Sequence, residues 1–211
     1  MTQPLIDPSR PAATDPSVPI PAEPRPVTVL YTMPRSVYLT LPGVDCWDAK
    51  RDARKWPGGT PVVAHPPCAP WCQLRWVSKI RPGQKQFGRH GVRMIRRWGG
   101  VLEQPARSDL FRDQHIPVPG QGKALSYTIE VNQVWMGHQC EKKTWLWIKG
   151  VPLEALPPIP FRLAYPTHKV SCFAWKKSLK NIRAGKASYT PLALAEWLVS
   201  VARLVSEDYH P

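Results

Sequence analysis

The sequence predicts an α/β domain in which helices cover a mostly parallel β-sheet. From Val27 onward, short apolar runs rich in Val, Leu, Ile and aromatic residues alternate with longer mixed segments. Strands that alternate with helices are typical of this class. Hydrophobic residues make up 43% of the 211 residues, which is enough to build one domain with a sizeable core.

The N-terminal segment, residues 1–26, is predicted to be a separate proline-rich arm. Residues 1–28 contain eight of the 26 prolines and few aliphatic residues. A segment of this composition buries too little apolar surface to offset the entropy lost on ordering, so we expect it to be flexible. The α/β domain is therefore assigned to residues 27–211.

Short apolar runs bounded by Pro, Gly and polar residues predict the strands of the sheet. Such runs are too short for helices and rich in β-branched or aromatic residues. Six segments meet this description: Val27–Tyr31, Val44–Trp47, Pro61–His65, Val101–Glu103, Tyr127–Val131 and Thr144–Ile148.

Two segments predict helices. In Gln84–Trp98 the apolar residues fall on one face and the basic residues roughly opposite, as expected for a surface helix. The second lies near the C-terminus, where we expect Thr190 to cap the helix and Pro191 to take its first helical position, before the apolar residues 192–199. The first helix's apolar face is Phe87, Gly91, Met94, Ile95 and Trp98, and its basic residues are Lys85, Arg89, Arg93, Arg96 and Arg97.

The charge balance favours an anionic partner. Lys and Arg number 29 against 15 Asp and Glu, for a net charge of +14. Such an excess indicates nucleic acid first and an anionic membrane surface second. No apolar run approaches the roughly 18 residues that span a bilayer, and the N-terminus lacks a signal-peptide pattern. With an odd number of cysteines, five, we expect a cytoplasmic protein without a membrane segment.

Two stretches free of acidic residues could follow a phosphate backbone. Arg75 to Arg97 contains eight Lys or Arg residues, and Ala155 to Ala195 is also without Asp or Glu. The alternative for each stretch is an ordinary solvated surface. A polar, basic segment before the last strand, interleaved with Trp, could add base stacking and phosphate contacts. The predicted nucleic-acid-binding residues are Arg75, Arg89, Arg93, Lys142, Lys143, Lys176 and Lys177.

Cys68 is a candidate nucleophile. It follows the strand Pro61–His65 directly after Pro66-Pro67, and the two prolines end the strand abruptly. Ligands bind at the carboxyl ends of strands in open α/β sheets, so a thiol held there is well placed for chemistry. The alternative is a small buried cysteine, because free Cys is among the most buried residue types.

Glu103 repeats the arrangement after a second strand. A short apolar run ends in Glu103-Gln104-Pro105, which predicts a carboxyl group at the same sheet edge as Cys68. Desolvation in a partly apolar cleft would raise the pKa of this carboxyl group, so that it could hold a proton near neutral pH. The alternative is a glutamate that caps a turn.

A zinc site is not predicted. His65-x2-Cys68-x3-Cys72, His138-x-Cys140 and His168-x3-Cys172 offer suitable ligand types, but no CxxC pair occurs and the spacings do not fit the usual zinc motifs. The zinc deaminases that act on bases need an HxE with a PCxxC, and neither is present. A zinc-stabilised binding module is therefore only a third hypothesis.

Four segments in this order resemble the cytosine-C5 DNA methyltransferases, and more narrowly their small phage-encoded relatives. Pro66-Pro67-Cys68-Ala69-Pro70-Trp71-Cys72 resembles the family's nucleophile loop, Pro-Pro-Cys-Gln-Pro-Phe-Ser. Glu103-Gln104-Pro105 resembles its Glu-Asn-Val or Glu-Asn-Pro segment. Gln139-Cys140-Glu141-Lys142-Lys143 falls where the family has Gln-x-Arg-x-Arg, and Ser188-Tyr189-Thr190-Pro191 resembles its closing segment.

The resemblance implies a reduced Rossmann-like methyltransferase sandwich and a covalent mechanism on a base flipped out of DNA. Cys68 would add to cytosine C6, with a pKa lowered by surrounding positive charge. Glu103 would hydrogen-bond N3 and the exocyclic amine. S-adenosylmethionine would then donate a methyl group to C5, with Asp45, Asp48 and Asp52 as the acids available to its ribose or adenine.

Departures from the family pattern leave a second hypothesis open. The glycine-rich cofactor loop is missing, because Thr32-Met33-Pro34-Arg35-Ser36 follows the first strand and no glycine occurs before Gly43. The large target-recognition domain is also missing, so a partner protein could supply sequence recognition. The alternative function is a catalytically silent nucleic-acid-binding protein on the same fold.

Overall fold

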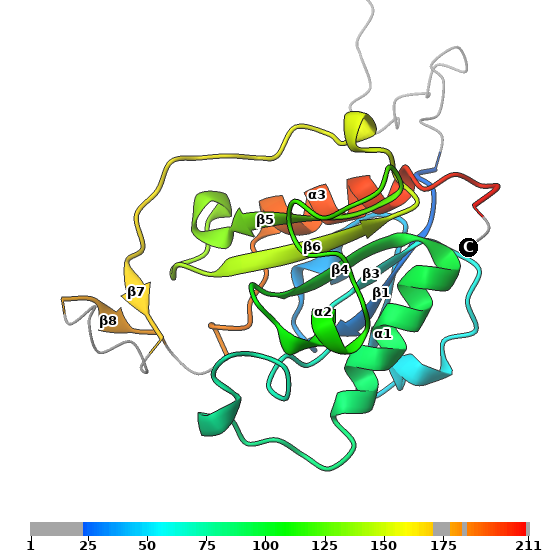
Figure 1. The fold of residues 1–211 in the computed structure, drawn as a ribbon. Coiled ribbons are helices and arrows are strands. Elements are labelled where there is room, and N and C mark those ends of the chain that lie inside the picture. The colour runs from blue at the N-terminus through cyan, green and yellow to red at the C-terminus, as the bar shows by residue number, and fades with distance from the viewer. Residues whose placement is uncertain (1–22, 171–177, 183–184, 210–211) are drawn as a thin grey trace, which may run out of the picture.

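A computed structural model describes residues 23–170, 178–182 and 185–209 of the chain. Its centre is a six-stranded sheet with strand order β2-β1-β3-β4-β6-β5 (Figure 1). Most of the predicted arm, residues 1–22, and both Lys176 and Lys177 lie outside the described residues. The strands of the sheet are β1 (Val27–Thr32), β2 (Val44–Asp48), β3 (Val62–Ala64), β4 (Gly100–Pro105), β5 (Ser126–Asn132) and β6 (Lys143–Lys149).

The sheet is mostly parallel, as predicted. Strands β2, β1, β3 and β4 run in one direction, whereas β6 runs antiparallel to both of its neighbours, β4 and β5. Each of the six predicted strands is confirmed, with ends that differ by at most two residues. A second sheet pairs two short parallel strands, β7 (His168–Lys169) and β8 (Lys180–Asn181).

Helices cover both faces of the sheet. Helix α3 (Leu192–Arg203) lies on one face, and α1 (Lys85–Trp98) and α2 (Asp109–Asp113) lie on the other (Figure 1). No helix in the described parts of the chain is long and apolar enough to cross a membrane. Short 3-10 helices complete the fold: η1 (Val37–Thr40), η2 (Ala53–Lys55), η3 (Arg75–Val77), η4 (Gln133–Met136) and η5 (Leu153–Ala155).

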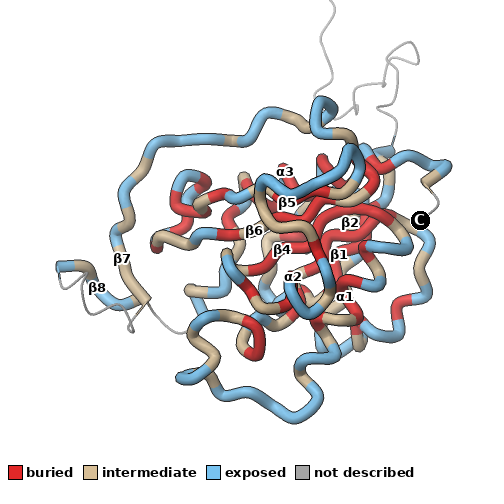
Figure 2. Tube along the Cα trace, viewed as in Figure 1, coloured by how far each residue is buried: buried red, intermediate tan, exposed pale blue. Residues whose placement is uncertain are grey.

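Two hydrophobic cores result, one on each face of the sheet. Successive side chains of a strand point to opposite faces. Val29, Val63 and Val101 therefore pack with α3, whereas their neighbours Leu30, Ala64 and Leu102 pack with α1 and α2. Figure 2 shows the buried strands in the centre of the molecule and the exposed loops around them.

The start of α3 differs from the prediction. The helix begins at Leu192, and Pro191 is the N-cap residue, with extended backbone angles and no side-chain capping hydrogen bond. Thr190 does not cap the helix; it lines the cavity described below. The helix is stabilised instead by burial of its apolar residues, among them Leu194 and Leu198.

Strands β3 and β4 approach each other closely at Gly100. The φ angle of Gly100 is +115°, and a Cβ atom at this position would lie 1.9 Å from the Val62 carbonyl oxygen. Only glycine fits such a contact. This contact fixes the spacing of the two strands that carry His65, Pro66 and Glu103 toward their carboxyl ends.

Candidate functional site

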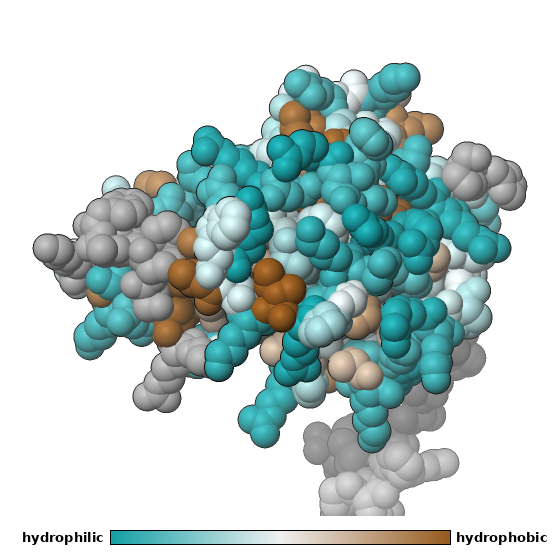
Figure 3. Space-filling view, turned by 60° about the horizontal axis from the view of Figure 1, so that its bottom comes forward, coloured by the Kyte–Doolittle hydropathy of each residue, from teal (hydrophilic) through white to brown (hydrophobic). Residues whose placement is uncertain are grey.

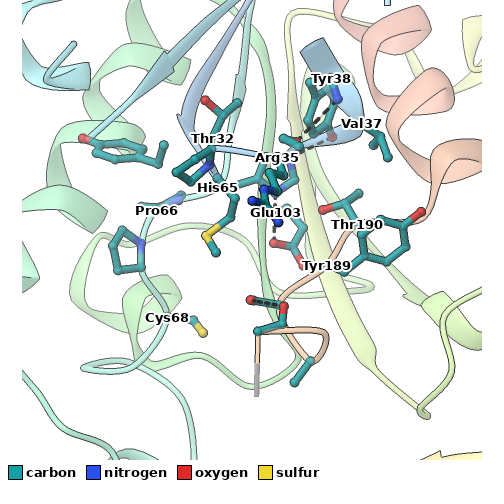
Figure 4. A pocket seen from close by; sticks show the side chains of 18 of the residues that line it. Thr32, Arg35, Val37, Tyr38, His65, Pro66, Cys68, Glu103, Tyr189 and Thr190 are labelled. Carbon is teal, nitrogen blue, oxygen red and sulfur yellow. Dashed lines mark hydrogen bonds and ion pairs between the residues drawn. The ribbon is translucent and has the colours of Figure 1, made fainter. Parts of the chain in front are cut away.

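A cavity of about 640 Å³ opens at the carboxyl ends of the adjacent strands β1, β3 and β4 (Figure 4). This volume is in the range of small-molecule sites, roughly 300–1,000 Å³. Cys68 and Glu103 both line it, so the structure brings the two predicted catalytic residues together. The other walls come from the segment after β1, from Lys142 and from the segment before α3 that contains Tyr189 and Thr190.

The loop after β3 holds Cys68 at the edge of the cavity. Pro66 and Pro67 stop the strand, and the backbone then turns so that the Cys68 carbonyl oxygen accepts hydrogen bonds from the N–H groups of Trp71 (2.9 Å) and Cys72 (2.8 Å). Cys68 itself is exposed, and the alternative of a small buried cysteine is therefore wrong for this residue. The thiol is accessible from the cavity.

Buried Gln104 anchors this loop from the neighbouring strand. Its Nε2 donates to the Pro66 carbonyl oxygen (2.8 Å), and its Oε1 accepts from the Ser108 hydroxyl (3.2 Å). The second residue of Glu103-Gln104-Pro105 thus positions the nucleophile loop, while the first faces the cavity.

Replacing Gln104 by Leu tests this anchor. The change leaves the buried Pro66 carbonyl without a donor, which should lower the free energy of unfolding by about 1–3 kcal/mol. The loop should also become more mobile, so hydrogen exchange at Trp71 and Cys72 should accelerate. The surface variant Gln114→Leu is the control, because its side chain bonds only within the exposed end of α2. Unchanged exchange at Trp71 and Cys72 would contradict the anchoring role.

Glu103 lies at the centre of a hydrogen-bonded group. Its side chain is buried, and Oε2 lies 3.2 Å from His65 Nδ1. Oε1 accepts from Gln133 Nε2 (2.9 Å) and lies 3.5 Å from the Lys142 ammonium group. The alternative role as a turn cap is not what the structure shows.

The pKa of Glu103 is lowered, whereas the sequence predicted that it would be raised. Burial alone would raise it, as the sequence suggests, but the Lys142 charge and the hydrogen bond from His65 outweigh burial and lower the pKa to about 2. Glu103 is therefore ionised near neutral pH and accepts hydrogen bonds rather than holding a proton.

His65 and Tyr38 also line the cavity, a role that the sequence did not predict for either residue. The Tyr38 hydroxyl lies 2.8 Å from His65 Nε2, and His65 Nδ1 faces Glu103 (Figure 4). A carboxylate can only accept hydrogen bonds, so Nδ1 carries a proton and donates to Glu103, while Nε2 shares the other hydrogen bond with the Tyr38 hydroxyl. His65 could have been predicted from its position at the end of the strand, directly before Pro66, but Tyr38 could be found only from the fold.

Cys68 also differs from expectation. The pKa of Cys68 is raised, not lowered, first by a hydrogen bond with the Cys72 thiol, then by partial desolvation of the sulfur beside the cavity wall and by the nearby Glu103 charge. Lys142 lowers the pKa of Cys68 but does not outweigh these effects, because the same ammonium group is paired with Glu103. Conversely, the hydrogen bond from Cys68 lowers the pKa of Cys72.

The three acids predicted to hold a cofactor do not line the cavity. Asp45 accepts from Trp47 Nε1 and pairs with Arg51, and Asp52 pairs with Arg54. Asp48 is the nearest of them in the sheet, because it is in register with Thr32 at the carboxyl end of β2. Its carboxylate caps a turn by accepting from the backbone N–H groups of Lys50 and Arg51.

The segment after β1 instead lines the cavity and offers other groups to a cofactor. The pairing register shifts at Tyr31, which has a φ angle of +65°. Such a bulge redirects side chains. The next residue, Thr32, lines the cavity and has a buried hydroxyl without a partner among the described residues. Arg35 also lines the cavity and forms no ion pair with any described residue. These two side chains could hold the hydroxyl and carboxylate groups of a ligand.

The predicted nucleic-acid-binding residues have different surroundings. Arg75 pairs with Asp109 (3.0 Å) and Arg89 with Asp113 (2.9 Å), so neighbouring acids partly neutralise both. Arg93 and Lys143 are exposed, whereas Lys142 turns into the cavity toward Glu103. Figure 3 shows a largely hydrophilic face with hydrophobic groups between the polar ones. The loop before α1 adds the exposed side chains of Trp76, Val77 and Ile80.

Comparisons with known proteins give no further information. No family model matches the sequence, and no curated protein matches it. In the parts of the chain that the structure describes, no group of three or more His, Cys, Asp or Glu side chains could hold a metal ion. What the site does must therefore be argued from its own chemistry.

Proposed function

We propose that this protein modifies a pyrimidine base of DNA, most simply as a cytosine-C5 methyltransferase of reduced size. The observation that carries the proposal is one cavity that contains an accessible thiol, Cys68, and an ionised carboxylate paired with an ammonium group, Glu103 and Lys142. These residues come from separate strand ends and loops, and they match the order of the family segments that the sequence resembles.

The chemistry of these groups suits a covalent mechanism. The Cys68 thiolate would form a bond to C6 of the base, and the electron pair of the C5–C6 double bond would move to C5. Ionised Glu103 would accept a hydrogen bond from the exocyclic amine, and the Lys142 charge would stabilise the negative charge that develops on the ring. Loss of the C5 proton and release of Cys68 would then restore the double bond.

S-adenosylmethionine, when bound, would supply an electrophilic methyl group for C5. Arg35 would pair with its carboxylate, and the Thr32 hydroxyl would bond one of its polar groups. The target base must leave the duplex to reach Cys68, and a basic protein surface favours binding of the DNA from which it leaves.

The strand order supports the same proposal. The antiparallel strand β6 lies between β4 and β5 at one edge of an otherwise parallel sheet, and this arrangement is compatible with the Rossmann-like methyltransferase sandwich. Among the described residues between β6 and α3, only η5 and the short strands β7 and β8 occur, and they do not form a large domain for target recognition. A partner protein would supply sequence specificity under this proposal.

One observation favours a second candidate function, a nucleic-acid-binding protein without catalysis. The segment after β1 contains no glycine before Gly43, and the 3-10 helix η1 replaces a longer crossover helix between β1 and β2. Glycine lets the backbone approach a cofactor closely, so its absence weakens the case for one.

A trapping experiment separates the two functions. The protein is incubated with DNA that contains 5-fluorocytosine and with labelled S-adenosylmethionine. The fluorine replaces the C5 proton that the reaction must remove, so the covalent bond between the enzyme and the base cannot be released. We expect a covalent, labelled adduct with the wild type and none with Cys68→Ala.

Cys46→Ala is the matched control, because Cys46 lies on β2 and does not line the cavity. This variant should form the adduct as the wild type does. Tight DNA binding without an adduct in the wild type would overturn the enzymatic function and favour the second candidate. An adduct that persists in Cys68→Ala would exclude Cys68 as the nucleophile.

A further inference from the structure

The Lys142 ammonium group can stabilise charge on a bound base only if it is held at one place in the cavity. It lies 3.5 Å from Glu103 Oε1, and the lysine side chain is 21% exposed. A lysine side chain is long and flexible, and the entropy that it loses on ordering opposes a fixed ion pair. A backbone that is fixed at Lys142 would limit where the ammonium group can lie.

Three residues hold the backbone of Lys142 from both sides. The Lys142 N–H group donates to Asn132 Oδ1 (3.1 Å). Its carbonyl oxygen accepts from the Gln133 N–H group (3.0 Å) and from the Thr144 hydroxyl (3.2 Å). Both backbone polar groups of Lys142 therefore have partners, and the direction in which its side chain leaves the backbone is fixed.

The same hydrogen bonds reach Glu103. Gln133 is fully buried, and its Nε2 donates both to Glu103 Oε1 (2.9 Å) and to the Thr144 hydroxyl (2.9 Å). The buried Thr144 hydroxyl accepts from Gln133 and donates to the Lys142 carbonyl oxygen, which uses its proton and one lone pair. A continuous chain of hydrogen bonds thus joins the carboxylate to the backbone of the lysine with which it pairs.

The topology of the sheet brings these residues together. Asn132 ends β5 and is the N-cap residue of η4, where its side chain also accepts from the Val134 N–H group (3.4 Å). Asn132 is in register with Lys143, the first residue of β6. Strands β5 and β6 lie side by side (Figure 1), so Lys142 lies at the base of the connection between them.

We propose that Asn132, Gln133 and Thr144 are positioning residues that hold the Lys142 ammonium group beside Glu103 in the cavity. This inference rests on the proposed function and deepens it, because the place of the positive charge decides how well it stabilises the negative charge that develops on the ring. None of the three residues lines the cavity. They would therefore act through Lys142 and Glu103 and not on the base itself.

Thr144 offers a matched pair of substitutions. Thr144→Val keeps the shape of the side chain and removes the hydroxyl, whereas Thr144→Ser keeps the hydroxyl and removes only a methyl group. Thr128→Val is the control, because Thr128 is a buried threonine of β5 whose hydroxyl donates to the Pro117 carbonyl oxygen away from the cavity. Urea unfolding establishes that each variant is folded at the pH values used.

The first measurement needs neither DNA nor cofactor. Titration of the Glu103 carboxyl group is followed by carbon-13 NMR in glutamate-labelled protein, and Glu103→Gln identifies the signal. We expect Thr144→Val to raise the pKa of Glu103 by about one unit, because a less firmly held ammonium group lowers that pKa less. Thr144→Ser and Thr128→Val should leave the pKa of Glu103 as it is in the wild type.

Adding Lys142→Met shows whether the effect passes through the ammonium group. Lys142→Met alone should raise the pKa of Glu103, and Thr144→Val in the same protein should then change it no further. An unchanged pKa in Thr144→Val, or a shift that is equally large without the ammonium group, would overturn the assignment. Asn132→Ala, which removes the acceptor on the other side of Lys142 from a half-buried position, is the second test if Thr144→Val does not fold.

The trapping reaction separates this inference from the function on which it rests. Adduct formation by Thr144→Val should be about 10-fold slower than in the wild type, while Thr144→Ser should stay close to the wild type. A raised Glu103 pKa in Thr144→Val, without any adduct in the wild type, would support the positioning residues and overturn the methyltransferase function. An adduct that forms equally fast in the wild type and Thr144→Val would support the function and overturn the positioning role.

Discussion

Replacing Glu103 by Gln should lower the free energy of unfolding at neutral pH by roughly 3 kcal/mol. The pKa of Glu103 is lowered from 4.5 to about 2, chiefly because the Lys142 charge and the His65 hydrogen bond outweigh burial. A group with a lowered pKa stabilises the fold at pH values above its ordinary pKa, and this stabilisation is lost as the pH falls toward 2. The variant also leaves Lys142 facing the cavity without its carboxylate partner.

The measurement is urea unfolding of the wild type and Glu103→Gln across a series of pH values. The difference between the two proteins should be largest above pH 4.5 and should shrink steadily as the pH is lowered toward 2. Glu130→Gln is the control, because Glu130 is an exposed carboxylate on β5. A difference that stays constant over this range would show that Glu103 is not held ionised by its neighbours.

The same substitution should affect the reaction. An amide cannot supply the negative charge that faces the exocyclic amine, so trapping by Glu103→Gln should be about 100-fold slower or more. Trapping is measured on protein shown to be folded at the working pH, which separates the effect on the reaction from the effect on stability.

Gly100→Ala should lower the free energy of unfolding by about 4 kcal/mol, from the clash and the backbone strain together. The added Cβ would lie 1.9 Å from the Val62 carbonyl oxygen, and the pairing of β3 with β4 prevents the backbone from moving away. The positive φ angle of +115° adds strain, because only glycine adopts such angles without cost. The free energy of unfolding is measured by urea or thermal unfolding.

Gly59→Ala isolates the clash from the strain. Gly59 has a similar φ angle, +108°, but a Cβ there meets nothing within 4 Å. The free energy of unfolding of Gly59→Ala should therefore fall by only about 1–2 kcal/mol. The difference between the two variants measures the cost of the contact with Val62. Equal losses in both variants would mean that the strands can separate to admit a methyl group.

The sequence predicted the sheet well because its signal is local. Each run such as Val27–Tyr31 or Val44–Trp47 needs only its own composition and its bounding residues to be recognised as a strand. The meeting of Cys68 and Glu103 was also predictable, since both follow strands that run in one direction and therefore end at one edge.

The electrostatics of the site could not be predicted in the same way. The pKa of Glu103 depends on Lys142, which comes from the loop before β6 and was assigned to phosphate binding. The pKa of Cys68 depends on which of several charges is closest and on Cys72, one turn away. Both directions were wrong because they result from competition between burial and particular neighbours, and a sequence gives no distances.

The three acids predicted to hold a cofactor do not line the cavity, for a related reason. The resemblance required an acid near the end of the second strand, and three were available in the sequence. In the structure all three acids bond to nearby groups, and Thr32 and Arg35 line the cavity instead. A bulge at Tyr31, which has no distinct sequence signature, redirects this segment.

Tyr38 links the hydrophobic core to the cavity. Its ring packs in the core with residues of α3, and its hydroxyl bonds His65, which in turn bonds Glu103. Substitutions in α3 that repack this core would therefore shift the imidazole and the carboxylate, even though α3 begins almost 90 residues after Glu103 in the chain. The packing of the interior and the position of the imidazole therefore depend on the same side chain, so a change at Tyr38 should alter the stability of the core and the geometry of the site together.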